Sequence, residues 1–266
     1  MNPSSSTQPY PWRLFWLLLT AGILAALAIS PLAWEMLGAV LSKLERPSIP
    51  LPLLILVGVV QNLGLLALVV WSGLKLSRSL GLGAPLLESW VTGKPESNAS
   101  LARSLKAGLL TGVVLGIALV ISLLALAPQL PNLPFVIAAK LPIWKRFLAC
   151  FYGGIYEEIF TRLFLLTLIA WIANRSWQKS APKLSNSAFW FANISAAIIF
   201  GLGHLPSASL LMPITPLVVF AALTLNGVAG IAFGYLYREH GLEAAMIAHY
   251  TCDVALFVIG PAFLKP

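Results

Sequence analysis

The chain has 266 residues, of which 59% are hydrophobic and only 10% are charged, and its mean hydropathy is +0.87. These values lie outside the range of soluble globular domains and predict an integral membrane protein. The net charge of +8 comes from Lys and Arg in the connections between apolar runs, where such residues orient a membrane protein, so it does not indicate nucleic-acid binding.

Seven apolar runs are long enough to cross a bilayer as helices, the form in which a chain satisfies its own backbone hydrogen bonds in hydrocarbon. Uncertain boundaries leave six to eight spans open, and the expected fold is an all-α, polytopic transmembrane bundle. The runs cover Trp12–Trp34, Pro50–Leu74, Leu105–Ala127, Phe147–Ala173, Ser187–Leu205, Pro213–Tyr237 and Leu242–Phe263.

The chain divides into three predicted parts. Residues 1–11, rich in Ser and Pro, are expected to form a disordered tail. Residues 12–146 hold three apolar runs without ionisable groups in their middles and are expected to form a scaffold. The first run exceeds the hydrophobic region of a signal peptide, so we expect a retained helix. The polar connection Ser77–Arg103 has room for a short interfacial helix.

Orientation follows from the basic residues of the connections. If successive connections alternate between the two sides, the side with the N-terminus carries ten Lys and Arg residues and the other side carries six. This difference favours a cytoplasmic N-terminus, as in a multi-pass protein of a bacterial-type plasma membrane. Cys150 and Cys252 fall inside predicted helices and are expected to be small buried hydrophobes.

The third part, residues 147–266, carries every ionisable group predicted to lie within the membrane. A charge at the centre of a spanning helix costs about 2.5–3.5 kcal/mol, so a cluster of such groups indicates a function. The candidate site residues are Glu157, Glu158, Arg162, His204, His249 and Asp253.

The spacing of these residues along their helices indicates which side chains share a face and can interact. Glu158 and Arg162 are four residues apart on one face, and we expect an ion pair that offsets much of the burial cost. Glu157 is turned about 100° from Glu158, which leaves one glutamate structural and the other chemical. His249 and Asp253 are also four apart, so we expect their side chains to lie within hydrogen-bonding reach.

The set of groups is compatible with several functions. A base, two imidazoles and a second acid are sufficient for water activation and oxyanion stabilisation, and equally for a proton path or a metal site. His204, near the end of a helix, is compatible with an interfacial as well as a functional position. A proton-coupled transporter is disfavoured because no second half of the chain mirrors the first.

The same residues form three motifs that resemble those of the CPBP family, the CAAX protease and bacteriocin-processing (Abi) group. "EEIFTR" from Glu157 fits EExxxR, "FGLGH" ending at His204 fits FxxxH, and "HYTCD" from His249 fits HxxxN/D. Order and spacing agree over about residues 147–260. The resemblance implies an intramembrane endopeptidase related to the type II CAAX prenyl endopeptidases, with residues 147–266 as its catalytic core.

Motif positions imply a role for each residue. Glu157 would activate water that His204 helps to hold, while Glu158 and Arg162 would brace the site. His249 and Asp253 would stabilise the oxyanion, although Asp253 stands where the prenyl endopeptidases commonly have Asn. An ionised Asp cannot donate a hydrogen bond, so Asp253 is either protonated or an acceptor for His249, and we favour the acceptor role.

Cofactor and substrate stay open. Family members are often described as metalloproteases, and Glu157, His204 and His249 could hold zinc. We favour hydrolysis by glutamate with no required metal. Expected partners are membrane lipid and a peptide or lipidated protein substrate, with no nucleic acid. The alternative function is a catalytically inactive immunity or scaffold protein of the same fold, which would share every motif.

Overall fold

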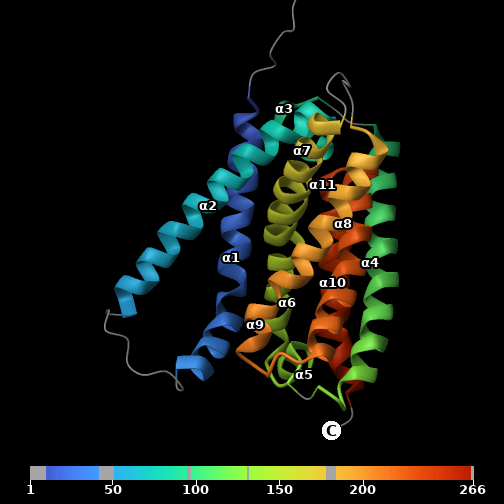
Figure 1. Ribbon diagram of the computed structural model, residues 1–266. Helices are drawn as coiled ribbons and strands as arrows, with labels where there is room; N and C mark the ends of the chain where they lie inside the picture. The colour runs from blue at the N-terminus through green and yellow to red at the C-terminus, as the bar shows by residue number, and fades with distance from the viewer. Residues whose placement is uncertain (1–9, 42–50, 95–96, 131, 178–183, 265–266) are drawn as a thin grey trace, which may run out of the picture.

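The computed structural model describes residues 10–41, 51–94, 97–130, 132–177 and 184–264 (Figure 1). This part of the chain is a bundle of helices and contains no strand, which confirms the predicted all-α class. Most of the tail predicted over residues 1–11 lies outside the described residues. Tyr10 is described, and its hydroxyl donates to the Trp71 carbonyl at 3.1 Å.

The elements follow one another along the chain with short connections. In the first half they are α1 (Trp12–Leu41), α2 (Leu51–Leu80), α3 (Pro85–Thr92), α4 (Asn98–Leu126), α5 (Pro134–Ala139) and α6 (Ile143–Phe151). Next come two π-helical segments, η1 (Tyr152–Glu157) and η2 (Ile159–Leu166), and then α7 (Thr167–Trp177). The remainder comprises α8 (Asn186–Gly203), α9 (Leu205–Ser209), α10 (Pro216–His240), α11 (Leu242–Asp253), the π-helical η3 (Val254–Ile259) and the 3₁₀-helical η4 (Gly260–Phe263).

Six helical stretches of the described residues are long and apolar enough to cross a membrane, which agrees with the predicted six to eight. The predicted span Phe147–Ala173 is not among the six, because α6, η1, η2 and α7 divide it into shorter α and π segments. These four elements nevertheless follow one another without a loop from Ile143 to Trp177, and we call them the central helix. The connection Ser77–Arg103 contains a short helix, α3, as expected, while its position at a membrane interface stays a prediction.

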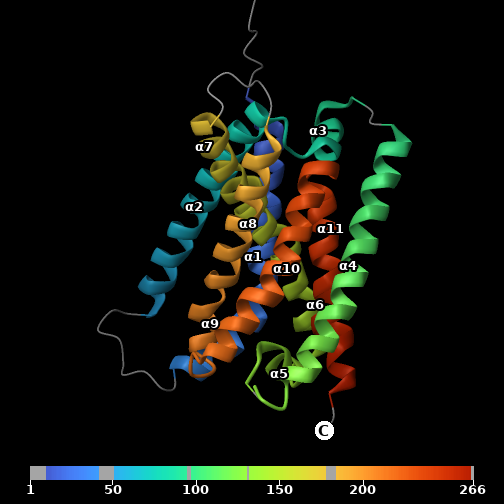
Figure 2. The same ribbon diagram turned by 45° about the vertical axis from the view of Figure 1, so that its right-hand side comes forward.

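The central helix is enclosed by neighbours on several sides. It packs against α1 and α2 on one side, against α8 on another, and against α11 on a third (Figures 1 and 2). Gly73 of α2 permits one of the closest approaches, since a Cβ there would lie 2.8 Å from the Leu163 carbonyl oxygen. The apolar side chains on the outside of the bundle are suited to lipid. Of the six predicted site residues, Glu158, Arg162, His249 and Asp253 are buried, whereas Glu157 and His204 are partly exposed.

Candidate functional site

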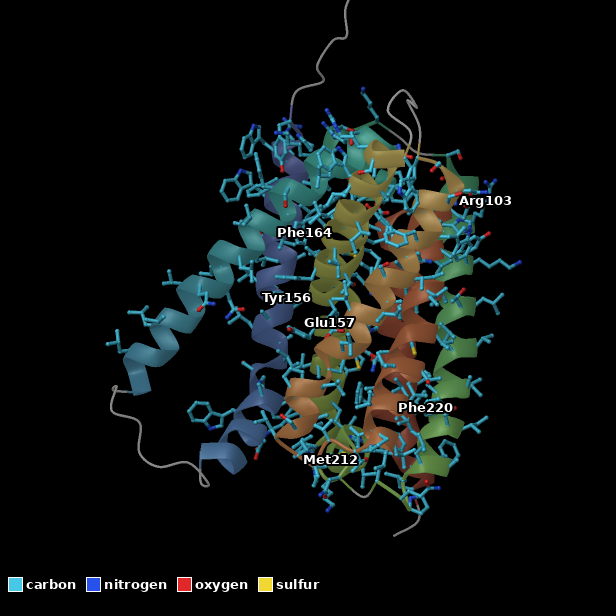
Figure 3. All side chains as sticks on the ribbon, in the orientation of Figure 1. Arg103, Tyr156, Glu157, Phe164, Met212 and Phe220 are labelled. Atoms are coloured by element: carbon cyan, nitrogen blue, oxygen red, sulfur yellow. The ribbon has the colours of Figure 1, made fainter. Side chains whose placement is uncertain are left out.

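The six predicted site residues lie on the central helix, at the end of α8 and on α11. Glu157 is the last residue of η1, and Figure 3 labels it near the middle of the height of the bundle. Glu158 stands between the two π segments, and Arg162 lies in η2. His249 and Asp253 are on α11, which packs against η1.

The π-helical segments distinguish this stretch from an ordinary spanning helix. A π turn carries one more residue than an α turn, and such turns occur frequently at functional sites. Two threonine hydroxyls accompany them: Thr161 Oγ1 donates to the Glu157 carbonyl at 2.5 Å, and Thr167 Oγ1 donates to the Arg162 carbonyl at 2.9 Å. The apolar pattern of the sequence gave no sign of these segments.

Glu158 and Arg162 form the ion pair predicted from their spacing. Arg162 Nη1 lies 2.8 Å from Glu158 Oε1, and the two residues expose 2% and 0% of their surface. Arg162 also donates through Nη2 to the Gly230 carbonyl at 3.0 Å and through Nη1 to the Thr161 hydroxyl. A cation with several acceptors is well compensated for its burial, so this pair is a structural anchor of the site.

His249 has a different hydrogen-bond partner from the one expected. Its Nδ1 lies 2.7 Å from Glu158 Oε1, the same oxygen that accepts from Arg162. The predicted partner, Asp253, has Oδ1 at 3.8 Å from His249 Nε2, which is too long for a hydrogen bond. The two side chains do lie on one helix face, as predicted, but the expected direct hydrogen bond from His249 to Asp253 was wrong. Glu158, on another helix, accepts a hydrogen bond from His249 instead.

The other ring nitrogen of His249 faces two carboxylates. Glu157 Oε2 and Asp253 Oδ1 each lie 3.8 Å from Nε2. Separations of this size exclude a direct hydrogen bond but can be bridged by one water. The Glu157 side chain is 23% exposed, against 0% for Glu158, so the two adjacent glutamates do face different surroundings, as their helical angle predicted.

Two aromatic rings complete the surroundings of His249 and were not anticipated. Phe233 of α10 stacks on the imidazole, with ring centroids 4.8 Å apart and planes inclined by 24°. Phe200 of α8 approaches it edge-on at 6.1 Å. The Arg162 guanidinium lies over both rings, at 5.2 Å from Phe200 and 5.5 Å from Phe233. These contacts fix the positions of the imidazole and the guanidinium together.

His204 is connected to the site through Phe200. Its Nδ1 lies 2.8 Å from the Phe200 carbonyl oxygen, and its ring is 4.7 Å from the Phe200 ring. No hydrogen bond or ion pair joins His204 to a carboxylate of the described residues. That His204 and Glu157 share one water stays a prediction.

The three residues that could hold zinc do not form a ligand group among the described residues. Among the described residues no three His, Cys, Asp or Glu side chains are placed to hold a metal ion. His249 Nδ1 is engaged by Glu158 and His204 Nδ1 by a backbone carbonyl, which leaves one nitrogen on each ring. The described residues therefore show no assembled zinc site, and a reaction without a required metal stays a prediction.

Gly153 is a further site residue, which the three sequence motifs do not include. A Cβ at this position would collide with Asp253 Oδ2 and lie 3.1 Å from His249 Nε2. Gly154, by contrast, adjoins Tyr250 and the Met246 carbonyl and serves the packing of α11. Gly153 thus makes room for the two functional groups of α11 beside the central helix.

We expect Gly153→Ala to reduce both stability and activity. The added methyl must displace Asp253 or His249, and overpacking of this kind costs about 1–3 kcal/mol. Gly227→Ala is the matched control, because nothing lies within 4 Å of its Cβ position in α10. Thermal unfolding of both purified variants measures the difference. Equal melting temperatures for the two would contradict the close approach at Gly153.

Comparison with known proteins finds a family model that matches part of the chain. Residues 139–255 match the family model described as type II CAAX prenyl endopeptidase Rce1-like, and this range contains all six predicted site residues. No curated protein and no solved structure gives a significant match to the chain.

Proposed function

With residues 139–255 placed in the CAAX protease (CPBP) family of intramembrane proteases, we propose that this chain is an endopeptidase that hydrolyses peptide bonds with water activated by Glu157. The chain is an integral membrane protein. The proposed location is a bacterial-type plasma membrane, with the N-terminus on the cytoplasmic side. The proposed substrates are peptides or proteins that are lipidated or anchored in the membrane.

One observation carries this proposal, the shared acceptor Glu158 Oε1. Because this oxygen accepts from both Arg162 and His249, the imidazole is held with Nδ1 toward Glu158 and Nε2 toward Glu157. Glu157 itself makes no hydrogen bond to Arg162 in the described residues and is the more exposed of the two glutamates. A fixed imidazole beside a carboxylate without a structural partner is suited to acid–base chemistry.

The proposed reaction uses these groups in two steps. A water between Glu157 and His249 gives a proton to the Glu157 carboxylate while its oxygen attacks the carbonyl carbon of the substrate. The tetrahedral oxyanion is stabilised by a proton on His249 Nε2, which requires the doubly protonated imidazole because Nδ1 already donates to Glu158. Glu157 then passes its proton to the leaving amine as the C–N bond breaks.

Asp253 has a secondary role in this proposal. An ionised carboxylate 3.8 Å from Nε2 cannot donate to an oxyanion, but it favours the positive charge that the imidazole carries during the reaction. Its side chain is 11% exposed, so this interaction is little screened by water. This replaces the hydrogen-bonded acceptor role inferred from the spacing of the two residues.

We expect proteolysis to persist after treatment with EDTA or phenanthroline, because the proposed steps use glutamate and histidine alone. The measurement is the cleavage rate of chelator-dialysed protein, combined with its elemental analysis. A loss of activity that stoichiometric zinc restores would overturn the metal-independent mechanism and leave the peptidase assignment intact.

The function itself is tested by incubating the purified full-length chain with a panel of peptides. The panel contains one C-terminal peptide in prenylated and unprenylated forms and one peptide attached to a membrane anchor. Cleavage of any member by the wild type, with the product bond identified by mass spectrometry, supports the endopeptidase. Binding of the panel without cleavage would favour the inactive scaffold instead.

A further inference from the structure

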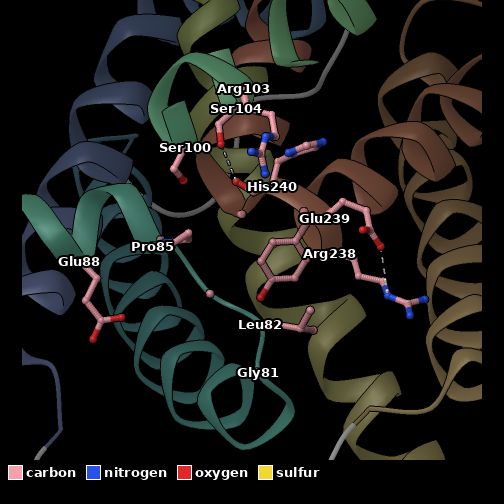
Figure 4. Close-up of a pocket in the computed structure, with 14 residues that line it drawn as sticks. Gly81, Leu82, Pro85, Glu88, Ser100, Arg103, Ser104, Arg238, Glu239 and His240 are labelled. Atoms are coloured by element: carbon pink, nitrogen blue, oxygen red, sulfur yellow. Dashed lines mark hydrogen bonds and ion pairs between the residues drawn. The ribbon is translucent and has the colours of Figure 1, made fainter. Parts of the chain in front are cut away.

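A polar pocket of about 250 Å³ lies at one end of the bundle, away from the candidate site (Figure 4). Four candidate membrane spans have their ends around it: one ends at Leu80, one ends at His240, and two begin at Ser100 and Leu242. Apolar spans end where the hydrocarbon meets the lipid headgroups. We therefore expect the pocket to lie near the level of the lipid phosphates.

The acidic side chains of the pocket are already neutralised. Glu88 forms an ion pair with Arg78, which comes from the end of α2. Glu239 lies 3.5 Å from the Arg238 guanidinium, a contact drawn in Figure 4. Each carboxylate that lines the pocket thus already has an arginine partner.

Arg103 is a cation of the pocket that takes part in neither of these two ion pairs. Within the described residues Arg103 makes no ion pair or hydrogen bond, although it lines a pocket that contains two carboxylates. His240 lines the same pocket, and Figure 4 shows the Arg103 and His240 side chains on the same side of it, with Ser100 and Ser104 close by. Ser104 Oγ donates to the His240 carbonyl at 3.3 Å and so joins α4 to the end of α10.

These groups match the chemistry of a phosphate. A guanidinium presents paired N–H donors that suit phosphate oxygens, while imidazole and hydroxyl groups supply further donors. Leu82, Ala84 and Pro85 add apolar surface at the pocket wall, which suits the glycerol and upper acyl carbons of a lipid. The pocket also lies on the side of the N-terminus, which the larger number of Lys and Arg residues assigns to the cytoplasm in our proposal, and the cytoplasmic leaflet is the one rich in anionic lipids.

We propose that this pocket binds the phosphate headgroup of an anionic phospholipid, with Arg103 and His240 as its principal donors. The site is separate from the proposed peptidase chemistry, and its occupancy can be measured without any cleavage assay. Failure of the lipid assignment and failure of the peptidase assignment would therefore be distinguishable.

The test is titration of the purified full-length chain, freed of lipid in detergent, with three probes followed by native mass spectrometry. The probes are dioctanoyl phosphatidic acid, dioctanoyl phosphatidylcholine and glycerol 3-phosphate. We expect phosphatidic acid to bind most tightly. We expect Arg103→Gln to weaken its binding about tenfold, the effect of losing one charge-assisted contact.

Lys106→Gln is the matched control, because it removes one positive charge from the same end of α4 but does not line the pocket. It should leave the affinity for phosphatidic acid within about twofold of the wild type, since a separated surface charge contributes little. Unchanged binding by Arg103→Gln, or equal losses in the two variants, would overturn the site. Glycerol 3-phosphate binding as tightly as phosphatidic acid would overturn the lipid assignment in favour of a soluble phosphate ester.

Discussion

Replacing Glu157 with Gln is expected to abolish proteolysis while the protein remains folded. Gln keeps the shape of the side chain but cannot take a proton from water, and loss of a general base lowers a rate by about 10²–10⁴-fold. The fold should tolerate the change because Glu157 is partly exposed and takes no part in the Glu158–Arg162 pair. The measurement is kcat/KM for a cleaved member of the peptide panel, together with the melting temperature.

Glu239→Gln provides the matched control for this chemical change. Glu239 lies at the end of α10, and its nearest ionic partner is the adjacent Arg238. The control should retain the activity of the wild type. Substantial turnover by Glu157→Gln would remove Glu157 from the mechanism, and a large fall in its melting temperature would assign the residue a structural role.

Arg162→Leu is expected to damage stability and activity together. It leaves Glu158 buried at 0% exposure without its cation, and breaking one side of such a pair costs about 3–5 kcal/mol. Arg175→Leu, on the same central helix but exposed near its end, controls for the loss of an arginine and should unfold close to the wild-type temperature. An unchanged melting temperature for Arg162→Leu would show that the pair does not stabilise the fold.

The double variant Glu158→Leu with Arg162→Leu separates the two roles of Glu158. Stability should recover in part, since no unpaired charge remains in the apolar interior. Activity should not recover, because His249 Nδ1 has lost its acceptor and the imidazole is no longer held in place. Recovery of both properties would mean that the Glu158–His249 contact does not contribute to function.

The spans and the Glu158–Arg162 pair could be predicted because each depends on local sequence. Lipid is a uniform solvent, so an apolar run alone indicates a spanning helix, and residues four apart on a helix are neighbours whatever else surrounds them. The same rule correctly placed Asp253 beside His249, at 3.8 Å, but the direct hydrogen bond expected between them was wrong. A carboxylate of another helix, Glu158, approaches closely enough to take the hydrogen bond instead.

Other parts of the site depend on tertiary packing that a single sequence does not encode in a recognisable pattern. Phe233 stacks on His249 from α10, yet in the sequence it is one more aromatic residue in an apolar run. Gly153 adjoins Asp253, yet a glycine in a spanning helix more often serves ordinary packing. In the sequence, Gly153 and Gly154 indicate that another helix approaches closely. The structure shows that this helix is α11 and that Asp253 is the side chain nearest to Gly153.

The turn between α10 and α11 consists of Gly241 alone, with φ of 88°, a conformation that favours glycine. Phe233 precedes this glycine by eight residues and His249 follows it by eight, so the two rings face each other across an antiparallel hairpin of equal arms. The length of this one-residue turn therefore fixes the register in which the Phe233 and His249 rings stack. A single residue inserted beside Gly241 would lengthen one arm only and move the imidazole along its helix by about 1.5 Å, with a rotation of about 100°, away from Phe233 and Glu158 alike.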